Sequence, residues 1–150
     1  MNQNIDKGRF LFIPRTLVFI KNNDKYLLII KNKAGFGHKK LNGIGGHIEQ
    51  GENPFQSARR EIFEETGLKI TDLVLTGLLF IDTMTNPGIQ VFIFKCKTSS
   101  FLTNNSEEGD LFWLSKEEIK KRNDAVEDLL DLIELCENYK YPEIPKLIQY

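Results

Sequence analysis

Two short apolar segments near the amino terminus constrain the fold more than any other feature of this sequence. Residues 16–20 (Thr-Leu-Val-Phe-Ile) and 26–30 (Tyr-Leu-Leu-Ile-Ile) have strand-forming composition, and the turn-forming residues 22–24 (Asn-Asn-Asp) lie between them. The pattern predicts a β-hairpin. Because the apolar residues are continuous rather than alternating, both faces of these strands are expected to be buried, which requires helices over the sheet. We therefore expect an α/β fold.

The helix with the clearest limits is predicted over residues 53–67. Asn53 suits the N-cap position, Pro54 suits the first helical position, and Gln56 completes a capping box. Gly67 suits the C′ position of a Schellman ending. One face of this helix is apolar and is expected to pack on the sheet; its members are Phe55, Ala58 and Ile62.

The rest of the chain predicts more strands and a single domain. Strands are expected at residues 73–82, 89–96 and 111–114. Residues 140–150 contain two prolines and are expected to be loosely attached. With 150 residues, of which 41% are hydrophobic, the chain suits one globular domain covering residues 1–150.

Two further helices are expected towards the carboxyl terminus, each beginning at a capping box. Ser115 with Glu118 predicts the start of a short helix, and Asp124 with Glu127 predicts the start of a second one. The second helix is amphipathic, and its apolar side carries Val126, Leu129, Leu130, Ile133 and Cys136. It therefore has a stripe that must be buried against another element.

Charge and cysteine usage exclude several classes of protein. The net charge is -1, so the broad basic surface that drives nucleic-acid binding is not expected. No apolar segment reaches the length of a membrane span or a signal sequence, so we expect a cytoplasmic protein without a membrane partner. Cys96 and Cys136 lie far apart without a CxxC partner. They are expected to be buried thiols rather than zinc ligands or a disulfide.

Three glutamates gather on the helix over residues 53–67. Glu61, Glu64 and Glu65 have i, i+3 and i+4 spacing, so their carboxylates are expected to converge. Each like-charged pair at this spacing destabilises a helix by about 0.2 to 0.5 kcal/mol. One interpretation is a solvated acidic surface. The other is a site for a divalent cation, since Mg²⁺ prefers carboxylate and phosphate oxygen.

A wider pattern decides between these two interpretations. Gly46, Glu52 and residues 60–68 (Arg-Glu-Ile-Phe-Glu-Glu-Thr-Gly-Leu) fill every position of the pattern Gx5Ex7REUxEExGU, where U is a bulky aliphatic residue. A chance match has a probability on the order of 10⁻⁹ per starting position. The pattern is the signature of the Nudix hydrolase family, which this chain resembles. The resemblance implies an α/β/α sandwich with a mixed β-sheet, with the signature helix on one side and the carboxy-terminal helix on the other.

The resemblance also implies metal ligands. In Nudix enzymes the carbonyl group at the position of Gly46 and carboxylates of the signature helix bind divalent ions; here these carboxylates are Glu61, Glu64 and Glu65. Mg²⁺ is the expected ion, and Mn²⁺ is an alternative. Arg60 is similar to the residue that orients a glutamate, in one network with Glu52. Glu108 resembles a late acidic residue that supplies a further ligand or the base, and Glu107 is the alternative.

Residues that resemble substrate contacts lie outside the signature. The chain is similar to MutT-type enzymes that clear oxidised purine triphosphates, and this likeness implies nucleotide contacts at Asn42, Phe36, Lys31 and Glu127. Each also has a structural interpretation: a turn asparagine, a loop anchor, a solvated lysine and a capping residue. One departure is clear, because those enzymes place a tryptophan where this chain has Ala125, before the acids Glu127 and Asp128.

The expected activity is metal-dependent hydrolysis of a nucleoside triphosphate to a monophosphate and pyrophosphate. Water attacks phosphorus, and Glu61 or Glu64 is expected to take its proton. ADP-ribose and dinucleoside polyphosphates are alternative substrates, and a non-catalytic nucleotide sensor is an alternative function. The expected partner is a small-molecule nucleotide, and the oligomeric state is left open between a monomer and a homodimer.

Overall fold

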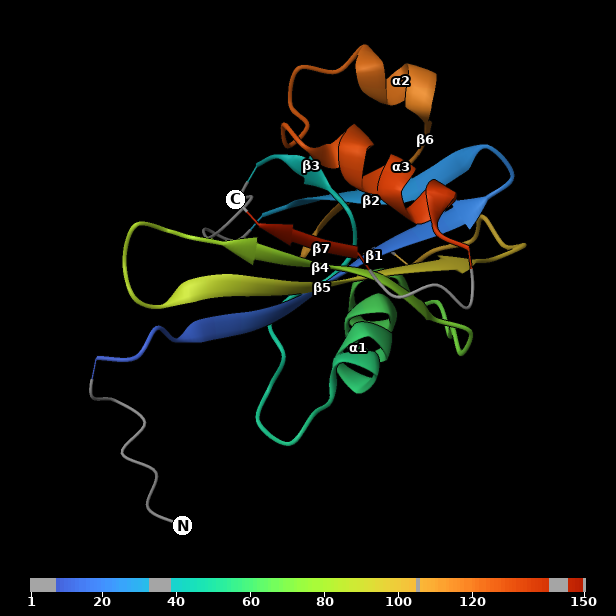
Figure 1. Cartoon of the computed structure of the whole chain (residues 1–150). Coiled ribbons are helices and arrows are strands. Elements are labelled where there is room, and N and C mark those ends of the chain that lie inside the picture. The colour runs from blue at the N-terminus through green and yellow to red at the C-terminus, as the bar shows by residue number, and fades with distance from the viewer. Residues whose placement is uncertain (1–7, 33–38, 105, 141–145, 150) are drawn as a thin grey trace.

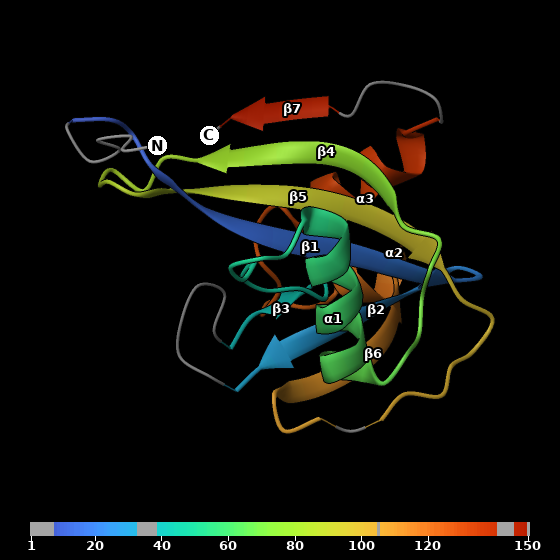
Figure 2. The same cartoon turned by 90° about the horizontal axis from the view of Figure 1, so that it is seen from below.

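A computed structural model of the chain describes residues 8–32, 39–104, 106–140 and 146–149. It contains one mixed β-sheet with helices on both faces (Figure 1). The elements in chain order are β1 (Phe12–Asn22), β2 (Lys25–Lys31), β3 (Leu41–Asn42), α1 (Pro54–Thr66), β4 (Val74–Ile81), β5 (Gly88–Lys97), β6 (Gly109–Ser115), α2 (Lys116–Lys120), α3 (Leu129–Asn138) and β7 (Lys146–Gln149). Helix α1 lies across one face (Figure 2), while α2 and α3 lie on the other side. The predicted α/β sandwich is confirmed.

The sheet has the order β3-β2-β1-β5-β4-β7, and β6 pairs with the other edge of β2. The pairs β1–β5 and β4–β7 are parallel, and the remaining pairs are antiparallel. The central strand β1 is paired with β5 along most of its length. The strand β1 therefore holds β2, β5 and the segment around residues 44–47 in place by backbone pairing.

The predicted hairpin of β1 and β2 is confirmed, but the two strands stay paired only near their turn. Their register runs from Asn22↔Lys25 to Ile20↔Leu27. Beyond that point β2 pairs with β3 instead of β1. The segment that follows β3 lies beside β1, with a bridge between Val18 and Ile44. A glycine-rich segment over residues 43–46 therefore lies between the two diverging strands.

Both faces of the central strands are buried, as the continuous apolar pattern predicts. Alternate side chains of β1 join different cores: Leu17 and Phe19 pack on the α3 side, whereas Val18 and Ile20 pack on the α1 side. The α1 core also contains Leu27, Ile29, Ile44, Ala58, Ile62 and Phe94. The α3 core also contains Tyr26, Leu28, Leu41, Ile93, Leu129, Leu132 and Ile133. The sheet thus needs a helix on each side to exclude water.

Helix α1 begins as predicted and ends slightly differently. The amide of Gln56 donates to Asn53 Oδ1 (2.9 Å) and the amide of Asn53 donates to Gln56 Oε1 (2.9 Å), which is the predicted capping box. Gly67 has φ 75° and its amide donates to the carbonyl of Phe63. The amide of Leu68 donates to Thr66 Oγ1 (3.1 Å), so the helix has the simpler αL ending instead of the Schellman ending.

The capping box at Ser115 is confirmed, and the one predicted at Asp124 is wrong. The backbone of Asp124 and Val126 hydrogen-bonds to Leu41 of β3 in an extended arrangement. Since this pairing prevents helical backbone at these residues, α3 begins only at Leu129. The carboxylate of Asp124 instead pairs with Arg122 (2.6 Å).

The carboxyl terminus also differs from its prediction. Residues 146–149 of the segment expected to be loosely attached form β7, which pairs in parallel with β4 from Gly77↔Lys146 to Phe80↔Gln149. The hydrogen-bonding edge that β4 presents on the side away from β5 explains this attachment. None of the helices in the described ranges is long and apolar enough to cross a membrane.

Packing of α1 on the sheet can be tested with two neighbouring residues. Ile62 is 0% exposed in the α1 core, whereas Phe63 is 52% exposed. Ile62→Ala is expected to lower the free energy of unfolding by about 2 to 5 kcal/mol, because it leaves a cavity in a dry core. Phe63→Ala, the matched control, should lower it by less than about 1 kcal/mol. Urea unfolding measures both values, and equal losses would contradict the assigned orientation of α1.

Candidate active site

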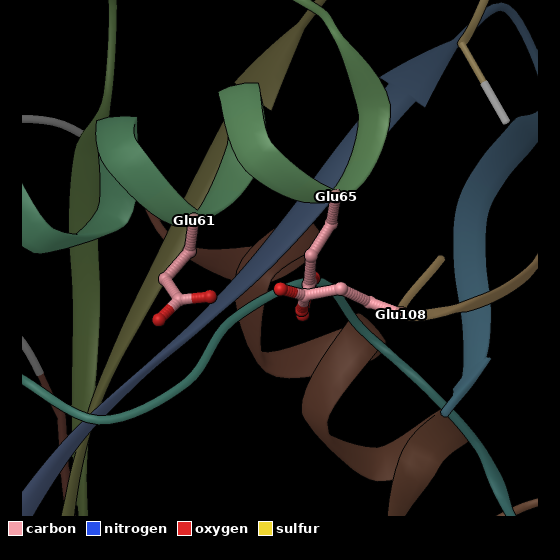
Figure 3. A group of neighbouring side chains, drawn as sticks. All are labelled: Glu61, Glu65 and Glu108. Carbon is pink, nitrogen blue, oxygen red and sulfur yellow. The ribbon is translucent and has the colours of Figure 1, made fainter. Parts of the chain in front are cut away.

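Three carboxylates from two distant segments meet beside the glycine-rich segment (Figure 3). Glu61 and Glu65 lie one helical turn apart on α1, and Glu108 lies immediately before β6. One carboxylate oxygen from each lies within 4.8 Å of the others. The carbonyl of Glu108 accepts a hydrogen bond from the amide of Asn32 (2.9 Å), which ties its loop to the end of β2. We name Glu61, Glu65 and Glu108 the carboxylate cluster.

The carboxylate cluster is unfavourable for the fold unless positive charge balances it. Glu65 is 0% exposed and Glu61 is 7% exposed. Burial raises the pKa of Glu65 to about 7 and also raises the pKa of Glu61, although Lys31 opposes both shifts. Buried carboxylates are normally paired with cations or coordinate metals. Three oxygen donors at this separation suit a hard divalent ion such as Mg²⁺.

Glycines allow the backbone to approach the carboxylate cluster closely. A Cβ atom on Gly46 would lie 2.4 Å from Glu61 Oε1, and one on Gly45 would lie 2.1 Å from the carbonyl oxygen of Thr16. The amide of Gly45 donates to Glu65 Oε2 (3.1 Å). The carbonyl of Gly46 accepts from the amide of Thr16 (2.9 Å), and a carbonyl oxygen has a second lone pair for an ion. These contacts fit the ligand role that the signature implies for Gly46.

Arg60 organises the acidic side chains around it. Its guanidinium binds Glu52 twice, through Nε–Oε1 (2.5 Å) and Nη2–Oε2 (2.9 Å), and this pairing lowers the pKa of Glu52 to about 2. Nη1 reaches Glu61 Oε1 (3.0 Å) and Glu64 Oε2 (3.2 Å). Nη2 also donates to the carbonyl of His47 (3.0 Å). Arg60 and Glu52 therefore hold Glu61 and the glycine-rich segment in one hydrogen-bonded network.

The structure separates the predicted acidic residues into two groups. Glu64 is not in the carboxylate cluster; its side chain is 46% exposed and lies against Arg60, four residues earlier on the helix. Glu65 shares the face of Glu61 by the same four-residue spacing. Of the two late acids, Glu108 joins the cluster and Glu107 is exposed to solvent.

A cavity of about 310 Å³ opens next to the carboxylate cluster, within the range of small-molecule sites. Its apolar lining comes from Leu17, Ile29, Leu79, Ile81, Val91, Val126 and Leu132. Polar and charged groups include Asn42, Lys31, Glu108 and Asp128. The cavity thus combines an apolar lining under α3 with one acid of the carboxylate cluster, Glu108.

Only some of the predicted substrate contacts line this cavity. Lys31 and Asn42 line the cavity, while Phe36 lies outside the described residues. Glu127 is not among the described residues that line it; the acid that does so is Asp128, at the start of α3. Burial raises the pKa of Asp128. The sequence contains two adjacent acids, Glu127 and Asp128, and both are candidates for this position. Because α3 begins at Leu129, Asp128 rather than Glu127 lines the cavity.

Arg15 is a cavity residue that the sequence did not reveal. Its Nη2 lies 2.9 Å from His47 Nε2, and both residues line the cavity. Burial, followed by the charges of Arg15 and Lys31, lowers the pKa of His47. Since a guanidinium can only donate, neutral His47 accepts this hydrogen bond. No motif marks Arg15, because its position depends on the pairing of β1 with residues 46–48, a tertiary contact.

The raised pKa of Glu65 gives a prediction for stability against pH. A carboxyl group that titrates near its ordinary value when unfolded and at about 7 when folded disfavours the fold once it ionises. In the metal-free protein Glu65 should therefore contribute a loss of stability as pH rises from about 5 to about 8, and Glu65→Gln should remove this contribution. Urea unfolding with a chelator measures it. Glu107→Gln is the exposed control and should keep the original dependence; an unchanged slope in Glu65→Gln would contradict the assignment.

Comparison with known proteins agrees with this geometry. A family model of the NUDIX domain matches residues 11–136. The chain is 28% identical over 142 residues to the oxidized purine nucleoside triphosphate hydrolase of Mus musculus, covering 90% of each chain. It is 32% identical over 116 residues to the protein of the same name from Danio rerio, covering 77% of this chain and 74% of that one.

A solved structure supports the same assignment. The NUDIX hydrolase from Nitrosomonas europaea superposes with a TM-score of 0.69 at 29% identity, covering 83% of this chain and 87% of that one. The family match spans the signature helix, the glycine-rich segment and the segment that carries Glu108. The chain therefore belongs to the Nudix family and is a Nudix pyrophosphohydrolase.

Proposed function

We propose that this protein uses Mg²⁺ to hydrolyse nucleoside triphosphates, with oxidised purine nucleotides as preferred substrates, to a monophosphate and pyrophosphate. It acts in the cytoplasm on small-molecule nucleotides. The observation that carries the proposal is the carboxylate cluster, with oxygens within 4.8 Å of one another, one member of which, Glu108, lines a cavity that also has an apolar lining. Phosphates and a base need these two environments side by side.

The residues that would hold the ion are Glu61, Glu65 and Glu108, with the carbonyl of Gly46. A bound divalent ion lowers the pKa of water and offsets charge on the phosphates. Arg60 holds Glu61 in place, because its Nη1 hydrogen bond (3.0 Å) is supported by the bidentate pair with Glu52. In the reaction, water oxygen bonds to phosphorus, the bond to the leaving pyrophosphate breaks, and a carboxylate takes the proton.

The base-binding end would be formed by Asn42 and Asp128. The amide of Gly43 donates to Asn42 Oδ1 (2.8 Å), which fixes the side chain so that its NH₂ group can donate to a ligand. The structural interpretation of Asn42 and its binding role are therefore compatible. The carboxyl oxygens of Asp128 can accept hydrogen bonds from a base, and burial raises the pKa of this group. Ala125 stands where the similar enzymes have a tryptophan, and its neighbour Val126 lines the cavity, so base binding here would depend on aliphatic contact and these two polar groups.

A substrate panel tests the proposal directly. Purified protein with Mg²⁺ is offered canonical and oxidised purine triphosphates, ADP-ribose and dinucleoside polyphosphates, and products are identified by chromatography. We expect the highest kcat/KM for an oxidised purine triphosphate, with pyrophosphate as product, and loss of turnover on chelation of the ion. Release of orthophosphate, turnover in the presence of a chelator, or preference for ADP-ribose would each contradict the proposal.

The carboxylates can be ranked by substitution. Glu61→Gln, Glu65→Gln and Glu108→Gln should each lower kcat by about 10²- to 10⁴-fold, because each keeps the side-chain volume but removes charge from the reacting centre. Glu107→Gln, one residue away and exposed, should retain activity within about twofold. Glu64→Gln then decides whether Glu61 or Glu64 is the base: full turnover in that variant excludes Glu64. Full activity of the Glu108→Gln variant would show that Glu108 is not a metal ligand or base.

A further inference from the structure

The ammonium group of Lys31 lies against the carboxylate cluster. Its Nζ is 2.5 Å from Glu65 Oε1, and it donates a hydrogen bond to the carbonyl of Gly45. The amide of Gly45 donates to the other oxygen, Glu65 Oε2 (3.1 Å). Lys31, Gly45 and Glu65 therefore form a closed ring of contacts around a carboxylate that is fully buried.

Strand register, rather than chance placement of a surface side chain, sets this position. Lys31 is the last residue of β2 and pairs with Gly109 of β6. Glu108 precedes Gly109, and the carbonyl of Glu108 accepts a hydrogen bond from the amide of Asn32, which follows Lys31. The pairing of β2 with β6 thus places Lys31 and Glu108 close together.

The same position suits a divalent ion. Glu65 contributes one carboxylate oxygen to the carboxylate cluster, and Lys31 already contacts its Oε1. An ammonium and a divalent ion on one carboxylate oxygen repel each other strongly in a partly buried site. The cavity, which Lys31 also lines, offers the ammonium a second place.

Building on the proposed metal site, we propose that Lys31 is a tethered counter-cation that a divalent ion displaces. Without the ion, Lys31 balances Glu65 and keeps the carboxylate cluster together. When the ion binds, the ammonium moves into the cavity, where it faces the phosphates of the nucleotide. Because ion binding makes Lys31 available to the phosphates, ion and nucleotide bind with positive coupling, each raising the affinity for the other.

Lys40 provides an internal control for this movement. It lines the same cavity, and no ion pair involves it within the ranges that the structure describes. Displacement by an ion should therefore free the ammonium of Lys31 from an ion pair, whereas the exposed Lys40 has no such contact among the described residues to lose. Both lysines belong to one chain, so their reactivities can be compared in one sample.

Amine labelling of the nucleotide-free protein tests the proposal. The protein is acetylated briefly with and without Mn²⁺ or Mg²⁺, and the modification at each lysine is quantified by peptide mass spectrometry. Bound Mn²⁺ is measured in parallel from the loss of the free-ion EPR signal. The ion should raise the labelling rate of Lys31 about fivefold, as expected for loss of one favourable ion pair, and change that of Lys40 less than about twofold. Glu65→Gln should label faster at Lys31 without the ion and respond little to it.

The outcomes separate this inference from the proposed function. Bound Mn²⁺ with unchanged or slower labelling of Lys31 overturns the inference and leaves the metal-dependent activity standing. Absence of Mn²⁺ binding overturns both. Faster labelling of Lys31 in a protein that does not hydrolyse triphosphates supports the counter-cation and contradicts only the substrate assignment. If Glu65→Gln is unstable, the comparison of Lys31 with Lys40 in the unmodified sequence still decides the matter.

Discussion

The structure depends on the placement of two buried carboxylates late in a helix. Glu61 and Glu65 have little or no exposure, and burial raises the pKa of each. A helix selected for stability alone would not carry them, because buried charge is unfavourable without a partner. Around them the chain supplies Arg60, Lys31 and backbone amides. The positive and hydrogen-bonding groups of this region therefore have one common purpose, which is to hold negative charge in a fixed place.

The sheet explains why this place adjoins a cavity. Strands β1 and β2 separate beyond Leu27, and residues 43–46 run beside β1 with glycines where side chains would strike Glu61 or Thr16. On the α1 side this arrangement brings backbone against the carboxylates, and on the α3 side it leaves an apolar chamber. One divergence of two strands thus accounts for both the close approach of the backbone to the carboxylates and the apolar cavity beside it.

Local sequence patterns predict several features of the fold and of the site. The capping box at Asn53, the buried hairpin and the acidic face of α1 are short-range features, and each was predictable from residues a few positions apart. The positions of Arg15, Glu108 and Asp128 depend on strand register and on where α3 begins, which are set by distant segments. The same limit explains the wrong capping box at Asp124, because pairing with Leu41 overrides a favourable local motif. Likewise β7 arises from the available edge of β4 rather than from its own sequence.

The surroundings of Glu64 differ from those of the other two glutamates of α1. Spacing alone places three glutamates together, yet the helix turns Glu64 towards Arg60 and solvent while Glu61 and Glu65 turn inward. Glu61 and Glu65 are thereby held in a fixed geometry by their buried surroundings, whereas the side chain of Glu64 is half exposed. Arg60 donates hydrogen bonds to both Glu61 and Glu64, so the orientation of one acid depends on that of the other.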